Sequence, residues 1–305
     1  MKRNHIDDIE LENTEQNQLL KFKVAKKSTL VSVFVNIFLA FWQIIIGFIS
    51  HSQGLIADGI HSLSDLVADF VVLIANKGSQ RKPDADHPYG HLRYENAASL
   101  ILGTILLMVG IGMVISAIHK IWDPSSIPEV HSIALYVALF ALIAKEGLFR
   151  YMLRVAKKVD SNMLIANAWH ARSDAASSLV VAIGIIGNLA GYKFFDPLAA
   201  LIVGIFVGRM GWRFTYQALQ DLMDRGADEE TLEEITQALL STPGVLGVHD
   251  LKTRRAGDYL LVDVHLEING ELTVRNSHDI VVNARNRVLT NKQILSVMVH
   301  VDPAY

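Results

Sequence analysis

The sequence contains no cysteine in its 305 residues. Disulfide bonds, iron–sulfur clusters and thiolate metal sites are therefore excluded, because each requires cysteine sulfur. A metal site in this chain would have to take its ligands from histidine, aspartate and glutamate. The chain also lacks a large net charge, since the formal value is -3 at pH 7. Its overall charge gives no attraction for nucleic acid, and no nucleic-acid partner is expected.

Hydrophobic residues make up 51% of the sequence, and the mean hydropathy is +0.29, which is apolar for a soluble protein. A membrane-spanning helix needs about 20 mostly apolar residues. Such runs occur at residues 28–50, 54–77, 96–120, 132–153, 164–190 and 194–213. The first run is too long and too far from the N-terminus to be a secretory signal peptide. We therefore expect an α-helical membrane protein with an N-terminal arm (1–27) and a domain of six transmembrane helices (28–213).

Basic residues gather on one side of this arrangement. The arm has four lysines between residues 21 and 27, and the loops after the second and fourth runs contain further lysines and arginines. The opposite loops contain only Lys120 and Lys193. Because loops rich in lysine and arginine stay in the cytoplasm, both termini of this multi-pass protein are predicted to be cytoplasmic. The compact length without a targeting segment indicates a bacterial cell (inner) membrane.

Residues 214–305 change in composition and predict a small cytoplasmic domain. An amphipathic helix is expected at 228–242, and two strands at 245–255 and 259–268 form a hairpin that turns at Gly257-Asp258. A second helix (274–289) and a third strand (294–301) follow. The predicted fold of this domain is α+β, with the element order αββαβ.

Two predicted spanning helices contain the same pattern of ionisable residues. His61 and Asp65 occur in the second run, and His170 and Asp174 occur in the fifth. A spacing of four residues puts both groups on one face of a helix. Charged groups are costly inside a bilayer and usually mark function. Two imidazoles and two carboxylates suit zinc, and they would also accept cobalt, cadmium, iron or manganese.

The alternative interpretation is a polar network that only joins helices, and the matched pairs make it less favoured. Asp58 and Asp69 are not assigned as ligands. Asp58 is expected to line an access path or to cap a helix, and Asp69 to pair with a basic residue. Because metal ligands must be deprotonated, metal and protons compete for the same site. Histidine titrates near neutral pH, so such a site can exchange metal for protons.

The loop after the second run reads DADHPYGH, and Pro88 and Gly90 bend it so that Asp84, His87 and His91 could converge on a metal. The alternative is a solvated loop with two incidental histidines. The C-terminal domain adds four histidines, His249, His265, His278 and His300, together with Asp302. A single histidine on a strand is usually structural, but four within about 50 residues favour metal binding.

Together these motifs resemble those of the cation diffusion facilitator family, and the resemblance covers nearly the whole chain after Lys27. The segments that carry it are ADGIHSLSD, DADHPYGH, HARSD, LMDRG and the four histidine segments GVHDLKTR, VDVHLEI, NSHDI and VHVDP. The resemblance is to bacterial zinc/iron-type members, which are homodimeric metal exporters and often metal–proton antiporters. It implies a metallochaperone-like fold for the C-terminal domain.

The resemblance also implies specific sites. They are a transport site of His61, Asp65, His170 and Asp174, a loop site of Asp84, His87 and His91, a binuclear cytoplasmic site of His249, His265, His278, His300 and Asp302, and a charge interlock of Arg93 with Asp224. The cytoplasmic site would hold two copies of the domain together. Family members often have lysine in place of Arg93. Some bacterial members have aspartate in place of His61, and the set of two histidines and two aspartates resembles the zinc-selective branch.

The expected function is zinc(II)/proton antiport by alternating access, with zinc as the cargo and as a regulatory ligand and with H+ as the counter-ion. Export of iron(II), manganese(II), cadmium or cobalt by the same mechanism is the alternative. An intramembrane metal enzyme is a remote alternative, because the chain has no H-E-x-x-H motif and four protein ligands leave no open position for water. A metal receptor that does not transport is the other remote alternative.

Overall fold

The computed structural model describes residues 5–79, 81–123, 127–158, 162–257 and 259–304. The chain divides into two compact units. The first unit comprises residues 1–70 and 105–211, and the second comprises residues 71–104 and 212–305. Helices α2, α3 and α6 each contribute residues to both units, so each unit is described by itself below.

Long helices cover all six predicted spanning runs. In the part of the chain that the structure describes, they are α1 (His5–Ile49), α2 (Gln53–Ser79), α3 (Tyr94–Trp122), α4 (Ile133–Lys158), α5 (Asn162–Leu189) and α6 (Phe195–Leu222). Residues 27–49 of α1, together with α3 and α6, are long and apolar enough to cross a membrane by length and composition. Helices α2, α4 and α5 contain the ionisable residues of the candidate site.

Helix α1 begins at His5, although the sequence predicted an arm outside the first spanning helix. The reason is local, since residues 5–27 contain no proline or glycine and many good helix formers such as leucine, lysine, glutamate and glutamine. The helix therefore continues without interruption through the polar segment. Where the arm ends and the membrane-spanning part begins stays a prediction.

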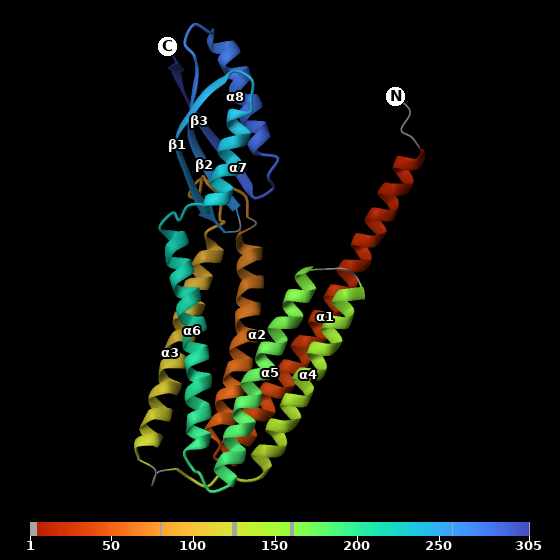
Figure 1. The fold of residues 1–305 in the computed structure, drawn as a ribbon, viewed down its shortest axis with the longest axis vertical. Coiled ribbons are helices and arrows are strands. Elements are labelled where there is room, and N and C mark those ends of the chain that lie inside the picture. Colours follow the sequence, from red (N-terminus) through yellow and green to blue (C-terminus); the bar gives the residue numbers. More distant parts are fainter. Residues whose placement is uncertain (1–4, 80, 124–126, 159–161, 258, 305) are drawn as a thin grey trace. The chain divides into compact units, whose positions relative to one another are not determined.

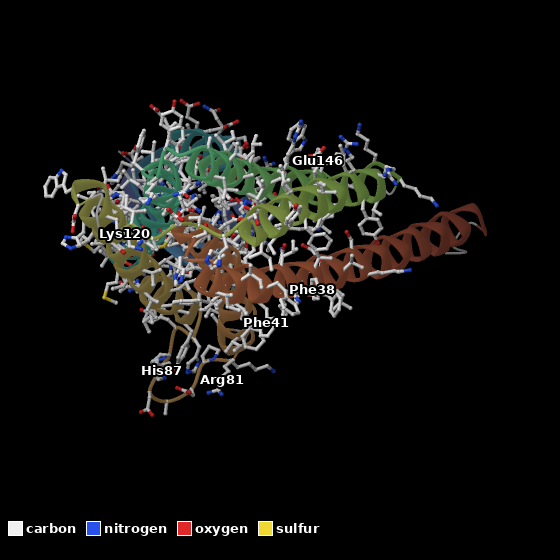
Figure 2. All side chains as sticks on the ribbon, turned by 90° about the horizontal axis from the view of Figure 1, so that it is seen from below. Phe38, Phe41, Arg81, His87, Lys120 and Glu146 are labelled. Carbon is white, nitrogen blue, oxygen red and sulfur yellow. The ribbon has the colours of Figure 1, made fainter. Side chains whose placement is uncertain are left out.

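The first unit has a core of aliphatic side chains and alanines. Leu55 of α2, Val181 and Ile185 of α5 and Val203 of α6 are fully buried there, and alanines of α4 pack against them. Helices α4 and α5 run side by side along their length (Figure 1). On the outside of α1, large apolar residues such as Phe38 and Phe41 are exposed and project away from the helices (Figure 2). An apolar surface of this kind is suited to contact with lipid.

Helices α3 and α6 approach so closely that glycine is required between them. A Cβ added at Gly110 would lie 2.4 Å from the backbone nitrogen of Gly208, and one added at Gly211 would lie 2.3 Å from the backbone nitrogen of Leu107. Small residues that let backbones meet are typical of helix packing in membranes. We call this contact the α3–α6 seam.

The second unit contains one sheet of three strands, β1 (Val245–Ala256), β2 (Tyr259–Asn269) and β3 (Ile294–Ala304), in the order β1-β2-β3. Strands β1 and β2 are antiparallel, while β2 and β3 are parallel. Helices α7 (Glu229–Leu240) and α8 (Val274–Val288) pack on this sheet (Figure 1). The predicted αββαβ order is confirmed. Gly257 has a left-handed φ of 60° at the hairpin turn, and Asp258 lies outside the described residues.

Alternation along β2 gives the sheet two different faces. Leu260, Val262, Val264, Leu266 and Ile268 are buried against α7 and α8. The intervening residues, which include His265, face the other side, because successive side chains of a strand alternate between the two faces. The helix-covered face forms the core, and the uncovered face holds polar side chains.

Candidate metal centres

Three of the four predicted transport-site residues come together in the first unit. Ligand atoms of His61, Asp65 and Asp174 all lie within 4.8 Å of one another. His61 Nδ1 is 3.7 Å from Asp65 Oδ2, and both side chains are largely buried. His61 Nδ1 has no hydrogen-bond partner among the described residues. A buried ring nitrogen without a hydrogen bond, next to two carboxylates, is a geometry that a divalent metal would complete.

His170 lies one helical turn before Asp174 on α5 and is exposed, so the described cluster forms without it. Its neighbours form a different contact. The guanidinium carbon of Arg172 is 5.0 Å from the centre of the Phe149 ring and 5.1 Å from that of Trp169. The contact with Phe149 joins this part of α5 to α4, whereas Trp169 belongs to α5 itself. The role of His170 as a fourth ligand stays a prediction.

Next to this cluster lies a buried ion pair that the sequence reasoning did not identify. Lys145 Nζ is 3.2 Å from Asp58 Oδ1, and the two side chains are 2% and 1% exposed. Ser177 and Ser178 of α5 and Gln43 of α1 also donate hydrogen bonds to Asp58. A lysine in the middle of the apolar fourth run was the available signal, because buried lysine almost always has a partner.

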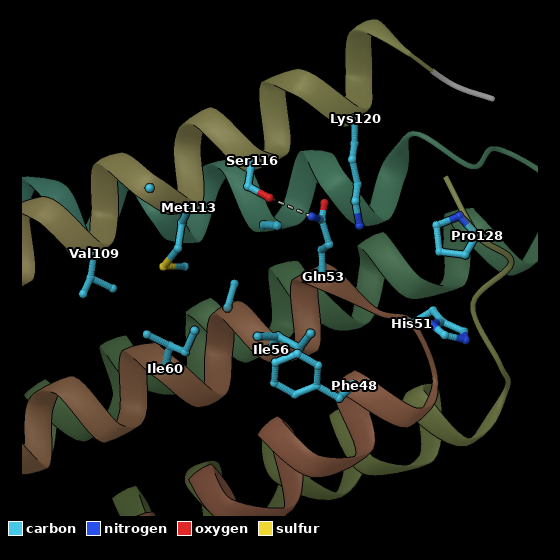
Figure 3. Close-up of a pocket in the computed structure, with 14 residues that line it drawn as sticks. Phe48, His51, Gln53, Ile56, Ile60, Val109, Met113, Ser116, Lys120 and Pro128 are labelled. Carbon is cyan, nitrogen blue, oxygen red and sulfur yellow. Dashed lines mark hydrogen bonds between the residues drawn. The ribbon is translucent and has the colours of Figure 1, made fainter. Parts of the chain in front are cut away.

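A cavity of about 520 Å³ lies within the first unit. Its lining includes His51 and Lys120 near helix ends, and it follows α2 as far as Ile60, the residue before His61. Gln53 Nε2 donates a hydrogen bond to Ser116 Oγ across the space between α2 and α3 (Figure 3). Most of the lining residues are apolar, so the cavity offers few metal ligands.

The predicted loop site is assembled in the second unit. Asp84 Oδ1 is 3.2 Å from His87 Nδ1, and Asp84 Oδ2 is 3.4 Å from His91 Nε2. Gly90, with a φ of 82°, turns the chain between the two histidines. The ring of His91 is buried and stacks on Tyr94. Three potential ligands therefore converge on one side of the loop.

The backbone N–H of His87 donates a 2.7 Å hydrogen bond to Asp84 Oδ1. This bond is the main reason why the pKa of the Asp84 carboxyl lies below its usual value. His91 Nδ1 is buried and has no hydrogen-bond partner among the described residues. The loop thus keeps a charged carboxylate beside two imidazoles, as a metal site requires.

The sheet of the second unit brings three of the four predicted cytoplasmic histidines together. His249 pairs with His265 across β1 and β2, and His265 pairs with His300 across β2 and β3. Asp302 connects them, because its carboxylate is 2.9 Å from His265 Nδ1, 3.2 Å from His249 Nε2 and 3.4 Å from His300 Nε2. The hydrogen bond with His265 is the main cause that lowers the pKa of Asp302.

Two acidic residues near this cluster were not predicted as ligands from the sequence. A ligand atom of Asp250, whose φ is 50°, lies within 4.8 Å of ligand atoms of His249 and His265. Glu267 Oε1 is 3.9 Å from His249 Nε2. Glu267 lies two residues after His265 on β2, so both face the same side, and this spacing was a usable signal. No sequence pattern predicted the left-handed backbone at Asp250.

His278 is exposed on α8, the helix that packs on the opposite, hydrophobic face of the sheet, and it is outside the described clusters. The predicted pair of Arg93 with Asp224 forms a salt bridge within one chain, and both side chains are about half exposed. Nearby, Asn96 Nδ2 donates to Asp221 Oδ2, and the Gly257 backbone N–H donates to Asn96 Oδ1. These bonds join α3, α6 and the hairpin turn of the second unit.

Comparison with known proteins agrees with this arrangement. Residues 29–223 match the family model for the cation efflux transmembrane domain, and residues 227–304 match that for the cation efflux protein cytoplasmic domain. An uncharacterized transporter of Methanocaldococcus jannaschii is 34% identical over 91% of this chain and 98% of its own length. The manganese efflux system protein MneP of Bacillus subtilis is 31% identical, over 93% and 97% respectively.

The magnetosome protein MamB of a Magnetospira strain is 32% identical over 83% of this chain and 86% of its own length. The two family models together span both the helical part and the α+β part, and the relatives align along most of the chain. The chain is therefore a metal cation transporter and not an enzyme, and it belongs to the cation efflux family, the cation diffusion facilitators.

Proposed function

We propose that this transporter exports zinc(II) from the cytoplasm in exchange for protons. The observation that carries the proposal is the cluster of His61, Asp65 and Asp174, with its buried ring nitrogen lacking a hydrogen bond. With His170, one turn away on α5, the donor set becomes two imidazoles and two carboxylates, which is a suitable tetrahedral set for zinc.

Exchange with protons follows from the chemistry of these ligands. Imidazole nitrogen and carboxylate oxygen bind a metal only when they are deprotonated, so protons and zinc compete for the same atoms. A site that is open to a neutral cytoplasm binds zinc, and a site that is open to a more acidic exterior takes up protons and releases it. Alternating exposure of one site to the two sides then couples the two flows.

The cavity that ends beside Ile60 supports an exit path. Its lining includes Lys120, which we place on the outer side of the membrane because the loops on the other side are richer in basic residues. Zinc released from His61 and its neighbours would leave through this cavity. The same distribution supports our proposal that both termini are cytoplasmic. We also propose that the protein lies in a bacterial cell membrane.

The two further clusters are proposed to be regulatory. Zinc bound by His249, His265, His300 and Asp302 would report the cytoplasmic metal level. His278 is on α8 and is absent from the described clusters, so we assign it to the corresponding site of a second copy in a homodimer. The loop cluster of Asp84, His87 and His91 is proposed as an accessory zinc site.

Manganese(II) is the second candidate cargo. The described cluster has one imidazole and two carboxylates, and oxygen-rich sites suit manganese better than zinc. The Bacillus subtilis relative MneP is a manganese efflux protein by name and aligns over nearly its whole length. Participation of His170 therefore decides between the two metals.

The test is metal uptake by the purified protein in acid-loaded liposomes that are diluted into neutral buffer with zinc or manganese. We expect zinc uptake that stops when a protonophore removes the pH difference. Asp65→Ala and Asp174→Ala should be folded and inactive. Uptake that is independent of the pH gradient would contradict proton exchange, and uptake that persists in both variants would contradict the assigned site.

A further inference from the structure

The buried pair Asp58–Lys145 lies close to the proposed transport site of His61, Asp65 and Asp174 along the helices. Asp58 precedes His61 by three residues on α2, and Ser177 and Ser178 follow Asp174 by three and four residues on α5. Residues three or four apart lie on the same face of a helix. The polar network is therefore one helical turn from the proposed ligands on both of the helices that provide them.

The carboxylate of Asp58 is already saturated with hydrogen-bond donors. Lys145 Nζ and Ser177 Oγ lie 3.2 and 2.9 Å from Oδ1, while Ser178 Oγ and Gln43 Nε2 donate to Oδ2, the former at 2.5 Å. The donors come from α1, α4 and α5. Although Asp58 shares a helix face with His61, its oxygens are directed away from metal binding by this set of donors.

Lys145 also contacts the backbone of α5 at Asp174, a proposed ligand. Its Nζ is 3.5 Å from the carbonyl oxygen of Asp174, and Ser177 Oγ lies 2.7 Å from the same oxygen. One ammonium group thus joins a side chain of α2 to the main chain of α5 at a proposed ligand. Burying such a pair costs desolvation energy that its attraction often does not recover, so stability alone is a poor reason for its presence.

We propose that Lys145 is a positioning residue for transport. Its ammonium sets the distance and register between α2 and α5 at the metal site, and it keeps Asp58 from becoming an additional ligand. This inference rests on the proposed function. Groups that orient ligands without touching the metal typically change affinity or activity by roughly 10- to 100-fold when they are removed.

The first test measures zinc uptake by Lys145→Met, which keeps the chain length and removes the charge. We expect its maximal rate to fall by roughly 10-fold or more, as for other groups that orient ligands. Its apparent KM should also fall, because Asp58 is released toward the metal. Lys145→Arg should recover part of the rate. Lys193→Met, which removes an exposed lysine paired with Glu129, is the matched control and should transport normally.

A double variant separates positioning from stability. Asp58→Leu with Lys145→Met removes both charges, which restores or improves thermal stability where a buried pair is dispensable. We expect this variant to be stable but to take up zinc slowly, because the link from α4 to the Asp174 carbonyl is absent. A normal rate in the double variant would overturn the proposal. This variant also provides the test if Lys145→Met does not fold.

A second readout does not depend on transport. Because the chain has no cysteine, Leu63→Cys on α2 and Leu179→Cys on α5 introduce two unique, exposed sites for spin labels. We expect a narrow distance distribution in the parent chain and a shifted or broadened one with Lys145→Met, whereas Lys193→Met should change nothing. An unchanged distribution would overturn the proposal. Absence of zinc and manganese uptake by the parent would contradict only the proposed function.

Discussion

The helical part and the sheet part of this transporter both assemble histidine with aspartate, but they hold these residues in different ways. On α2 and α5, the cluster of His61, Asp65 and Asp174 depends on how two separate helices are spaced, and a buried ion pair lies one turn away. On the sheet, His249, His265 and His300 are direct neighbours across paired strands. There the hydrogen-bond ladder of the backbone fixes the spacing.

This difference indicates what each cluster can do. Ligands on two helices can separate when the helices move, which is what release of a transported ion requires. Ligands on adjacent strands cannot separate without breaking the sheet, so they can bind and release metal without a large rearrangement of their own chain. These two ways of holding ligands are consistent with the proposed roles, transport for the helical cluster and sensing for the sheet cluster.

The largest expected effect comes from removing a proposed ligand on the helices. Asp174→Ala should lower zinc uptake by at least about 100-fold, because loss of a direct ligand should exceed the roughly 10- to 100-fold effects of ligand-supporting groups. The measurement is initial uptake into acid-loaded liposomes, with folding checked by size-exclusion chromatography. Substantial remaining uptake would mean that the two clusters do not differ in role as described.

The corresponding change on the sheet should have a smaller effect on rate. Asp302→Ala removes the carboxylate shared by three histidines and should lower the number of zinc ions bound per chain in equilibrium dialysis. Maximal uptake should stay within about 10-fold of the parent, below the range seen for groups that support ligands at an active metal. A loss as large as that of Asp174→Ala would remove the distinction between transport and sensing.

The pH dependence of stability sharpens the comparison further. The pKa of Asp302 is lowered in the folded chain by its hydrogen bond with His265, so its contribution to stability is present above the unfolded pKa of about 3.9. That contribution is lost as the pH falls through the lower folded pKa. Metal-free Asp302→Asn should therefore lose less stability than the parent on acidification below about pH 4, in thermal unfolding of the detergent-solubilised chain. Equal losses in the two proteins would contradict this assignment.

The smallest effect is expected at the exposed ion pair of the second unit. Arg93 and Asp224 are 48% and 51% exposed. Exposed pairs contribute about 0–1 kcal/mol, so Arg93→Ala should change the free energy of unfolding by no more than that. Lys145→Met, which breaks a buried pair, should cost about 3–5 kcal/mol by the same measurement. Similar costs at both positions would show that the buried pair is not desolvated as described.

Much of this architecture follows from the sequence because its signals are local. The length of the hydrophobic runs predicts the long helices, and the alternation of apolar residues between turns predicts the αββαβ order. The fold confirms both predictions. The convergence of Asp84, His87 and His91 was also predictable, since their close spacing and the bend at Gly90 bring them together.

Contacts between distant segments were harder to predict. Nothing in the pattern of α4 shows that Lys145 meets Asp58, because that requires the packing of α1, α2, α4 and α5 around one carboxylate. The exposure of His170 likewise depends on how α5 is turned against its neighbours and not on its spacing from Asp174. Asp250 joins the sheet cluster only through a backbone conformation that the sequence did not indicate.

The α3–α6 seam limits which mutations the gene can tolerate. At Gly110 and Gly211 even one added methyl group would overlap the backbone of the opposite helix, with separations of 2.4 and 2.3 Å. Membrane helices have few ways to relieve such overlap, because their contact depends on close packing of small residues. A missense scan of the gene should therefore find these two codons as intolerant of alanine as the codons for the proposed metal ligands.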